Sequence, residues 1–318
     1  MIKISGRVKQ LFQAIPYVND IYTRWKWRER IVSYGEENPE KIFYVIRRAT
    51  SKVGLFSHVL TNIGQLELAL NNGYIPVIDM QNNRNTYLEE DQIGRINAWE
   101  MFFEQPCSYS LKDISESKNV ILGCGILPDN LEYPSEKILQ NKDEFFRWHN
   151  ICKKYLRVNK EITDEADRLF QQMFGGERVL GILCRGTDYV KMKPHGHPIQ
   201  PTPEQMIEQA DQIIEEHQCK WLYLATEDEE YYQIFSDYYK DRLKVTRARR
   251  CNTDGNINDV SYERENDKYL KGKEYLINIL LLSKCNCFLA GMVNGTWGAL
   301  LLSDGFEYEK IFNLGIYE

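Results

Sequence analysis

The chain alternates short apolar runs with longer amphipathic segments. Each apolar run is too short for a helix and ends at Gly, Pro or a polar cluster, which is typical of buried strands in a largely parallel sheet. We therefore expect strands at residues 43–46, 75–79, 119–122, 179–183, 221–226, 243–245, 287–290 and 310–314.

Between these runs the apolar residues return at helical spacing. A helix at 161–174 is predicted to end at Gly175-Gly176, and Thr202-Pro203-Glu204-Gln205 has the composition of a capping box that opens the next helix. Further helices are expected at about 57–71, 142–155, 203–217, 270–283 and 299–302, with one after residue 229. Strand and helix in alternation predict an α/β protein built from Rossmann-like units.

Three of the predicted strands end in polar residues. Arg185-Gly186-Thr187-Asp188 follows the strand at 179–183. Thr226 ends the strand at 221–226 and is followed by Glu227-Asp228. Asn294-Gly295-Thr296 belongs to a turn that follows the strand at 287–290 and opens the helix at 299–302. Ligands of open α/β sheets bind at the carboxyl ends of strands, and free N–H groups at a helix start suit phosphate. The set predicts an anion site, although Arg185 could instead be an arginine that only pairs with Asp188.

Composition and charge argue against several classes of partner and cofactor. The net charge of −6 argues against nucleic acid as a partner, and the absence of G-x-G-x-x-G gives no support to NAD or FAD. The eight cysteines lack zinc-ribbon spacing and are interpreted as reduced thiols. Without a secretion signal or a long apolar span, the chain is expected to be soluble and cytoplasmic.

The segment 22–30 mixes tryptophan with basic residues and has two interpretations. It could rest on a membrane interface as a peripheral contact, or it could form a solvated helix that packs Trp25 and Trp27 inward. The second interpretation is the one we expect.

The polar motifs in their order resemble those of the GDP-fucose-dependent fucosyltransferases, the group of core α-1,6, rhizobial chitooligosaccharide and protein O-fucosyltransferases. Leu183-Cys184-Arg185-Gly186-Thr187-Asp188 is similar to that group's first strand-end motif, and Ala225-Thr226-Glu227-Asp228 to its second. The third is similar to residues 281–288 with Asn294-Gly295-Thr296, and residues 54–79 are similar to the Gly-rich loop, helix and strand of its first domain.

The resemblance implies a GT-B fold, with two Rossmann-like domains facing a central cleft. The acceptor-side domain would span residues 1–158 and the nucleotide-sugar-binding domain residues 159–318. It further implies an inverting transferase that passes fucose from GDP-fucose to a glycan hydroxyl without a metal or another cofactor. Arg185 and Asp188 would be catalytic, and the donor would bind at the following positions: Gly186, Thr187, Thr226, Glu227, Asp228, Asn278, Asn294, Gly295 and Thr296.

Two positions depart from the group's pattern. Leu183 stands where the group has a histidine, and Asn278 stands where it has an acidic residue for guanine. A transferase for another nucleotide-sugar, or a nucleotide- or glycan-binding protein without turnover, therefore stays an alternative. A base or an acceptor contact could come from His58, His195 or His197, each of which could also be a plain surface or capping residue.

Overall fold

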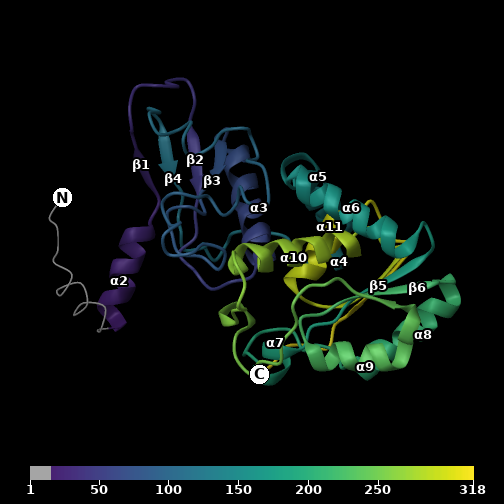
Figure 1. Ribbon diagram of the computed structural model, residues 1–318. Coiled ribbons are helices and arrows are strands. Elements are labelled where there is room, and N and C mark those ends of the chain that lie inside the picture. The colour runs from purple at the N-terminus through teal and green to yellow at the C-terminus, as the bar shows by residue number, and fades with distance from the viewer. Residues whose placement is uncertain (1–15) are drawn as a thin grey trace.

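The computed structural model describes residues 16–318, and for residues 16–19 and Asp188 it describes the backbone alone. Within this part of the chain two β-sheets form the frame of an α/β structure (Figure 1). The strands and helices follow the predicted alternation, and the mixed α/β class is confirmed.

The first sheet has the strand order β1-β4-β2-β3. Strands β2 (Phe43–Ile46), β3 (Ile75–Ile78) and β4 (Val120–Leu122) are parallel, and β1 (Arg30–Val32) pairs with β4 in antiparallel register at the edge. Helix α3 (Leu55–Asn71) links β2 to β3, so the predicted strand–helix–strand unit at residues 43–79 is present. The short edge strand β1 was not predicted, because its only two apolar residues, Ile31 and Val32, follow the charged run Arg28-Glu29-Arg30.

The second sheet is entirely parallel, with the order β7-β6-β5-β8-β9. Its strands are β5 (Val179–Leu183), β6 (Trp221–Ala225), β7 (Leu243–Lys244), β8 (Cys287–Gly291) and β9 (Tyr308–Phe312). The central strand β5 is buried at all five positions, which explains its continuous apolar run. Its neighbours are β6 and β8, so the three polar strand ends lie at one edge of the sheet.

Helices cover both faces of this second sheet. Helices α8 (Pro203–His217) and α9 (Glu229–Tyr239) pack on one face, over Leu180, Ile182 and Leu224. The other face carries α6 (Lys160–Phe174), α10 (Asp267–Leu282) and α11 (Asn294–Leu302). The predicted capping box of α8 is present, with the Thr202 hydroxyl accepting from the Gln205 N–H group.

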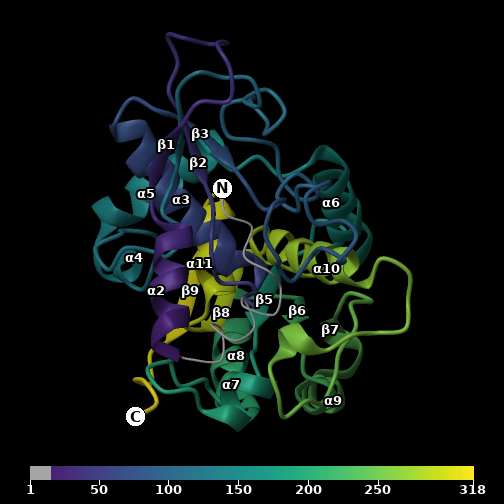
Figure 2. The same cartoon turned by 90° about the vertical axis from the view of Figure 1, so that its left-hand side faces the viewer.

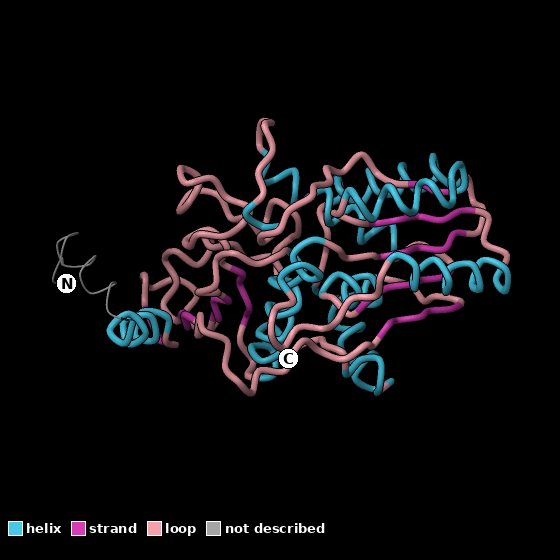
Figure 3. The backbone as a smooth tube through the Cα atoms, turned by 90° about the horizontal axis from the view of Figure 1, so that it is seen from below, coloured by secondary structure: helices cyan, strands magenta, loops and turns pink. Residues whose placement is uncertain are grey.

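One continuous apolar core joins the two sheets. It contains Ile46 and Ile78 of the first sheet and Leu183 and Phe288 of the second, with α3 and α11 between them. Helix α5 (Lys142–Tyr155), preceded by the short α4 (Lys137–Gln140), packs on both α3 and α11. Figure 2 shows α3 and α11 between the strands of the first sheet and strands β5, β8 and β9 of the second, and Figure 3 shows helices alongside the strands of the second sheet.

The structure corrects three local expectations. The residues after Arg185 form a short helix, α7 (Thr187–Met192), which is not among the helices expected from the sequence. Helix α11 already begins at Asn294, earlier than the expected residue 299. Helix α2 (Pro16–Trp27) buries Trp27 but leaves Trp25 exposed, so the expectation of two inward tryptophans was wrong for one of them.

The cysteines and the apolar character of the helices bear on two further expectations. The eight cysteines are all free, in line with the interpretation of reduced thiols. Within residues 16–318 we find no helix with the length and apolar character that crossing a bilayer requires.

Candidate functional site

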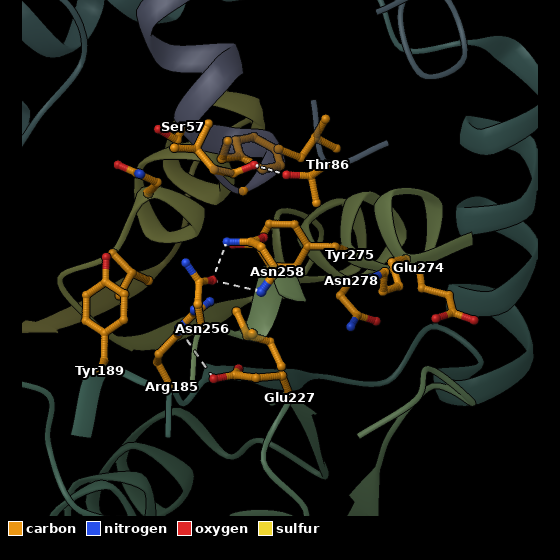
Figure 4. Close-up of a pocket in the computed structure, with 18 of the residues that line it drawn as sticks. Ser57, Thr86, Arg185, Tyr189, Glu227, Asn256, Asn258, Glu274, Tyr275 and Asn278 are labelled. Carbon is orange, nitrogen blue, oxygen red and sulfur yellow. Dashed lines mark hydrogen bonds and ion pairs between the residues drawn. The ribbon is translucent and has the colours of Figure 1, made fainter. Parts of the chain in front are cut away.

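A cavity of about 430 Å³ lies between α3 of the first sheet and the strand ends of the second. Its volume falls in the range of small-molecule sites. From the first half of the chain it is lined by residues 52–57, Thr86 and Tyr87. From the second half it is lined by Arg185, Glu227, Asn278 and Asn294, among others, which come from the ends of three strands and from helix α10 (Figure 4).

Arg185 lies in the wall of this cavity, two residues after the end of the buried strand β5. Its Nε atom lies 3.4 Å from Oε1 of Glu227, and its side chain is 17% exposed. The guanidinium carbon lies 4.9 Å from the centre of the Tyr189 ring, a cation–π distance. Two neighbours thus orient a permanently charged, planar group toward the cavity, and such a group is suited to a phosphate oxygen.

A buried carboxylate holds the ends of β5 and β6 together. Oδ2 of Asp228 accepts the Thr187 N–H at 2.8 Å, and its Oδ1 accepts the Tyr231 N–H at 3.0 Å as the N-cap of α9. A side chain at Gly186 would meet Oδ2 of Asp228 at 2.4 Å, so only glycine fits there. Thr187 adopts a φ of 45° and donates its hydroxyl to Glu227 at 2.9 Å. These contacts fix the direction in which Arg185 leaves the strand.

The start of α11 forms a neighbouring part of the cavity. Asn294 is exposed and lines the cavity, whereas Gly295 and Thr296 are buried beneath it. The Thr296 hydroxyl donates to the Gly291 carbonyl at 2.6 Å, so this hydroxyl serves the turn. At Gly295 a Cβ atom would meet the Tyr275 hydroxyl at 2.4 Å, which explains why the close approach of these two segments requires glycine. The helix start brings a positive end of the backbone dipole to the cavity.

Asn278 presents one side of its amide to the cavity. Its Oδ1 accepts hydrogen bonds from the Tyr223 hydroxyl at 2.9 Å and the Thr246 hydroxyl at 2.8 Å. The Thr246 oxygen itself accepts the Ala248 N–H at 3.4 Å, which leaves its proton for Asn278. Among the described residues Nδ2 of Asn278 bonds to no protein group, and Asn278 lines the cavity. A ligand at this point therefore meets an N–H donor.

Further groups on α10 set the electrostatics of this wall. Burial raises the pKa of Tyr275 to about 12, with Arg185 acting in the opposite direction, so the Tyr275 hydroxyl stays protonated at neutral pH. Glu274 also lines the cavity, and its carboxylate is held by both terminal nitrogens of Arg264, one of them at 3.0 Å. The carboxylate charge of Glu274 is therefore largely balanced.

A loop after β7 closes one side of the cavity. Asn256 and Asn258 of this loop line it, and Nδ2 of Asn258 donates to Oδ1 of Asn256 at 3.0 Å (Figure 4). Asp259 forms an ion pair with Lys52 of the first half at 2.8 Å, and Asp254 forms one with Lys191 of α7 at 3.1 Å. Both pairs are largely exposed, so each contributes little to stability.

The structure brings together only some of the predicted site residues. Arg185, Thr226, Glu227, Asn278, Asn294 and His197 line the cavity. Gly186, Thr187, Asp228, Gly295 and Thr296 are buried and support those that do. Asp188 is the second residue of α7, but its side chain lies outside the described part of the structure.

The three candidate histidines differ sharply in placement. His197 is exposed, lines the cavity and packs edge-on against Tyr189. His195 is exposed and does not line the cavity. His58 is buried in α3 against Tyr87, outside the cavity lining, and burial together with Arg48 lowers its pKa to about 3. It is therefore neutral at physiological pH.

Several cavity residues were not predicted from the sequence. Tyr189 and Tyr275 lie in helices where an aromatic residue is usually core, and Asn256 and Asn258 lie in a polar loop with no motif. Helical spacing offered one signal, because Glu274 and Asn278 are four residues apart and share a face of α10. Within residues 16–318 no cluster of three His, Cys, Asp or Glu side chains has the arrangement of a metal site.

We compared the chain with known proteins. No family model matches the sequence. No curated protein matches it either. Among solved structures, the fucosyltransferase NodZ from Bradyrhizobium is similar at a TM-score of 0.49 and 16% identity, over 83% of this chain and 94% of that one.

Two further similar structures come from other fucosyltransferases. A variant of FUT1 from Arabidopsis thaliana in complex with GDP has a TM-score of 0.45 and 9% identity, over 84% of this chain and 70% of that one. POFUT1 in complex with GDP has a TM-score of 0.40 and 12% identity, over 87% and 75%.

Proposed function

We propose that this chain is a glycosyltransferase that moves fucose from GDP-fucose to a glycan hydroxyl. The observation that carries the proposal is the placement of Arg185 and the start of α11 in one cavity, where both halves of the chain contribute the wall. A cation and a helix N-terminus suit a diphosphate. The order of the strand-end motifs resembles that of the GDP-fucose fucosyltransferases and supplies the identity of the donor.

We interpret the two sheets as the two Rossmann-like domains of a GT-B fold. The acceptor-side domain would comprise residues 1–158 and the donor-binding domain residues 159–318. In favour of this assignment, α3 and the loop before it face the carboxyl ends of β5, β6 and β8 across the cavity.

In the proposed reaction the bond between the sugar's anomeric carbon and the β-phosphate oxygen breaks, and the acceptor oxygen bonds to the opposite face of that carbon. The electron pair of the broken bond leaves with the diphosphate. Arg185 and the N–H groups at the start of α11 would stabilise this negative charge, and stabilising charge that develops in the transition state lowers the barrier. Because Arg185 supplies positive charge to the leaving diphosphate, the proposed reaction needs no metal ion.

The acceptor hydroxyl loses its proton as the new bond forms. Of the three candidate histidines only His197 lines the cavity, so we assign His197 as the base that accepts this proton. The assignment of Asp188 as a catalytic residue stays a prediction. We expect the acceptor to be a cytoplasmic precursor of a polysaccharide.

Ligand titrations followed by turnover test the proposal. We expect GDP to raise the unfolding temperature more than UDP, dTDP or CMP, with and without EDTA. At millimolar nucleotide, an affinity of about 0.1 mM adds about 1.4 kcal/mol of stability, which is easily detected. Release of GDP from GDP-fucose should then be measured with water or a glycan as acceptor.

The outcomes separate the alternatives. Stabilisation by UDP or dTDP, with turnover of the matching sugar, would retain the transferase and change its donor. Stabilisation by GDP without release of GDP from GDP-fucose would favour a binding protein. An absence of stabilisation by all four nucleotides would contradict the proposal.

A further inference from the structure

Helix α2 stands apart from the rest of the molecule. It lies at the edge of the structure in both Figure 1 and Figure 3, and its anchor is Trp27. The Trp27 ring is buried, lies 5.4 Å from the Arg47 guanidinium carbon, and packs so closely on Gly125 that a Cβ atom there would meet it at 2.0 Å. One end of α2 is thus fixed to the first sheet, while Ile21, Trp25 and Lys26 are exposed to solvent.

The outward face of α2 combines apolar and basic side chains. Ile21 is 51% exposed and Trp25 is 56% exposed, and their spacing of four residues places them on one face of the helix. Arg24 lies beside Trp25 on the helix. Arg28 directly follows the last residue of α2, and its guanidinium carbon lies 4.9 Å from the centre of the Trp25 ring. We call Ile21, Arg24, Trp25, Lys26 and Arg28 the α2 patch. All five are exposed.

Charge is distributed unevenly between this end of the chain and the remainder. Residues 1–30 contain seven Lys and Arg residues and two Asp and Glu residues. The remainder of the chain contains 33 Lys and Arg residues and 44 Asp and Glu residues. Arg24 pairs with Asp20 at 2.9 Å. Lys26, Arg28 and the neighbouring Arg30 form no ion pair with the described residues. A local excess of cations in an acidic protein favours an anionic surface as the partner.

We infer that the α2 patch docks on an anionic lipid surface and holds the protein peripherally at a membrane. Trp25 and Ile21 would enter the boundary between headgroups and acyl chains, and Lys26, Arg28 and Arg30 would contact the anionic headgroups. A second copy of the chain fits less well. A two-fold contact through this patch would place its cations opposite the same cations.

Vesicle flotation of the full chain tests the inference. We expect the protein to float with mixed phosphatidylglycerol–phosphatidylcholine vesicles and to stay behind with phosphatidylcholine alone. Trp25→Ser should weaken binding on the order of tenfold through the lost apolar contact. Lys26→Gln with Arg30→Gln should weaken it roughly thirtyfold, since each cation near an anionic surface contributes about fivefold.

Phe146→Ser is the matched control. Phe146 is also 56% exposed, but it lies on α5, and its loss should leave vesicle binding unchanged. Circular dichroism should show the same folded content in all variants. Equal flotation of the Trp25→Ser variant, or no flotation of the wild type with anionic vesicles, would overturn the inference. So would a concentration-dependent dimer that Trp25→Ser disrupts without any vesicle binding. None of these outcomes bears on the proposed transferase activity.

Discussion

Arg185 is the residue on which the proposed chemistry depends most. Arg185→Lys keeps the charge but loses the planar fork and the contact with Tyr189, which lies 4.9 Å away. Loss of one preorganised donor to a developing negative charge typically lowers the rate by about 10²–10³-fold. We expect a fall of that size in kcat/KM for release of GDP from GDP-fucose, with a smaller change in GDP affinity.

Arg178→Lys is the control for this change. Arg178 stands just before the same strand, at its opposite end, where it pairs with Glu307 on the surface. Its substitution should leave turnover near that of the wild type. Equal losses in the two variants would show that the effect of Arg185→Lys comes from the fold and not from the reaction.

Asn278 provides a second test at the scale of one side chain. Asn278→Asp can still accept from Tyr223 and Thr246, whose hydroxyls lie 2.9 and 2.8 Å from Oδ1, but it replaces the N–H donor by a second oxygen. We expect this amide to donate to a carbonyl oxygen of the base. GDP affinity, measured by calorimetry, should then fall about tenfold or more.

Asn258→Asp controls for the added charge, because Asn258 lines the same cavity from the loop. Tighter GDP binding by the Asn278→Asp variant would contradict the expectation. It would show instead that a carboxylate at this position accepts hydrogen bonds from the N–H groups of guanine.

Pairs of elements, and not single residues, determine where the site forms. Asp228 connects three elements, because its carboxylate joins the ends of strands β5 and β6 and caps helix α9. Asp228→Ala removes two hydrogen bonds to N–H groups, one of them a helix cap. We expect a loss of about 3 kcal/mol in the free energy of unfolding, measured with urea.

The same helix offers a control. Asp237→Ala removes an exposed carboxylate of α9 whose side chain accepts a hydrogen bond from Gln233, and it should change stability by less than about 0.5 kcal/mol. If Asp228→Ala is no more destabilising than Asp237→Ala, Asp228 does not hold the strand ends together.

Helix α3 carries a titratable group that should be visible in the pH dependence of stability. His58 is buried, and both ring nitrogens are without a hydrogen-bond partner among the described residues. Burial and Arg48 lower its pKa from 6.5 to about 3. The unfolded state therefore binds more protons between these values, so stability is retained above 6.5 and is lost as the pH falls toward 3.

His58→Gln removes this titration. Near pH 5 the wild type should lose about 2 kcal/mol relative to neutral pH through His58 alone, and the variant should lose correspondingly less. His195→Gln, at an exposed position, should not change the pH profile. Parallel profiles for wild type and His58→Gln would mean that His58 is accessible to protons in the folded protein.

Much of the molecule could be predicted from the pattern of its elements, and the limits of prediction have physical causes. The apolar run of β5 and the polar residues after it predicted the edge of the cavity. This prediction was possible because neighbouring residues in the sequence carry both signals, the burial of the strand and the polar groups at its end. Asn256, Asn258 and Tyr275 reach the cavity only through packing between distant segments, and no local signal records such packing. Trp25 was misplaced because periodicity does not show which side of a helix lacks a neighbour.

At the scale of the whole molecule, the two sheets share one core. Tyr44 and Ile46 of the first sheet belong to the same buried cluster as Phe288 and Ala290 of the second. Phe56 of α3 packs against Gly298 of α11, where a Cβ atom would lie 2.2 Å from the ring. Helix α5, which lies in the first half of the chain, packs on α11 and pairs Lys153 with Asp304. Neither half can keep its apolar surface covered without the other.

We therefore expect the protein to unfold in a single cooperative transition. Tryptophan fluorescence and far-UV circular dichroism should give coincident urea curves, since Trp99 and Trp148 lie in the first half and Trp221 and Trp297 in the second. A fragment of residues 159–318 lacks α3 and α5 and should expose α11, so it should aggregate or stay partly unfolded. Two separate transitions, or a stable monomeric fragment, would show that the predicted boundary near residue 158 divides two independently folding units and that the shared core contributes little to either.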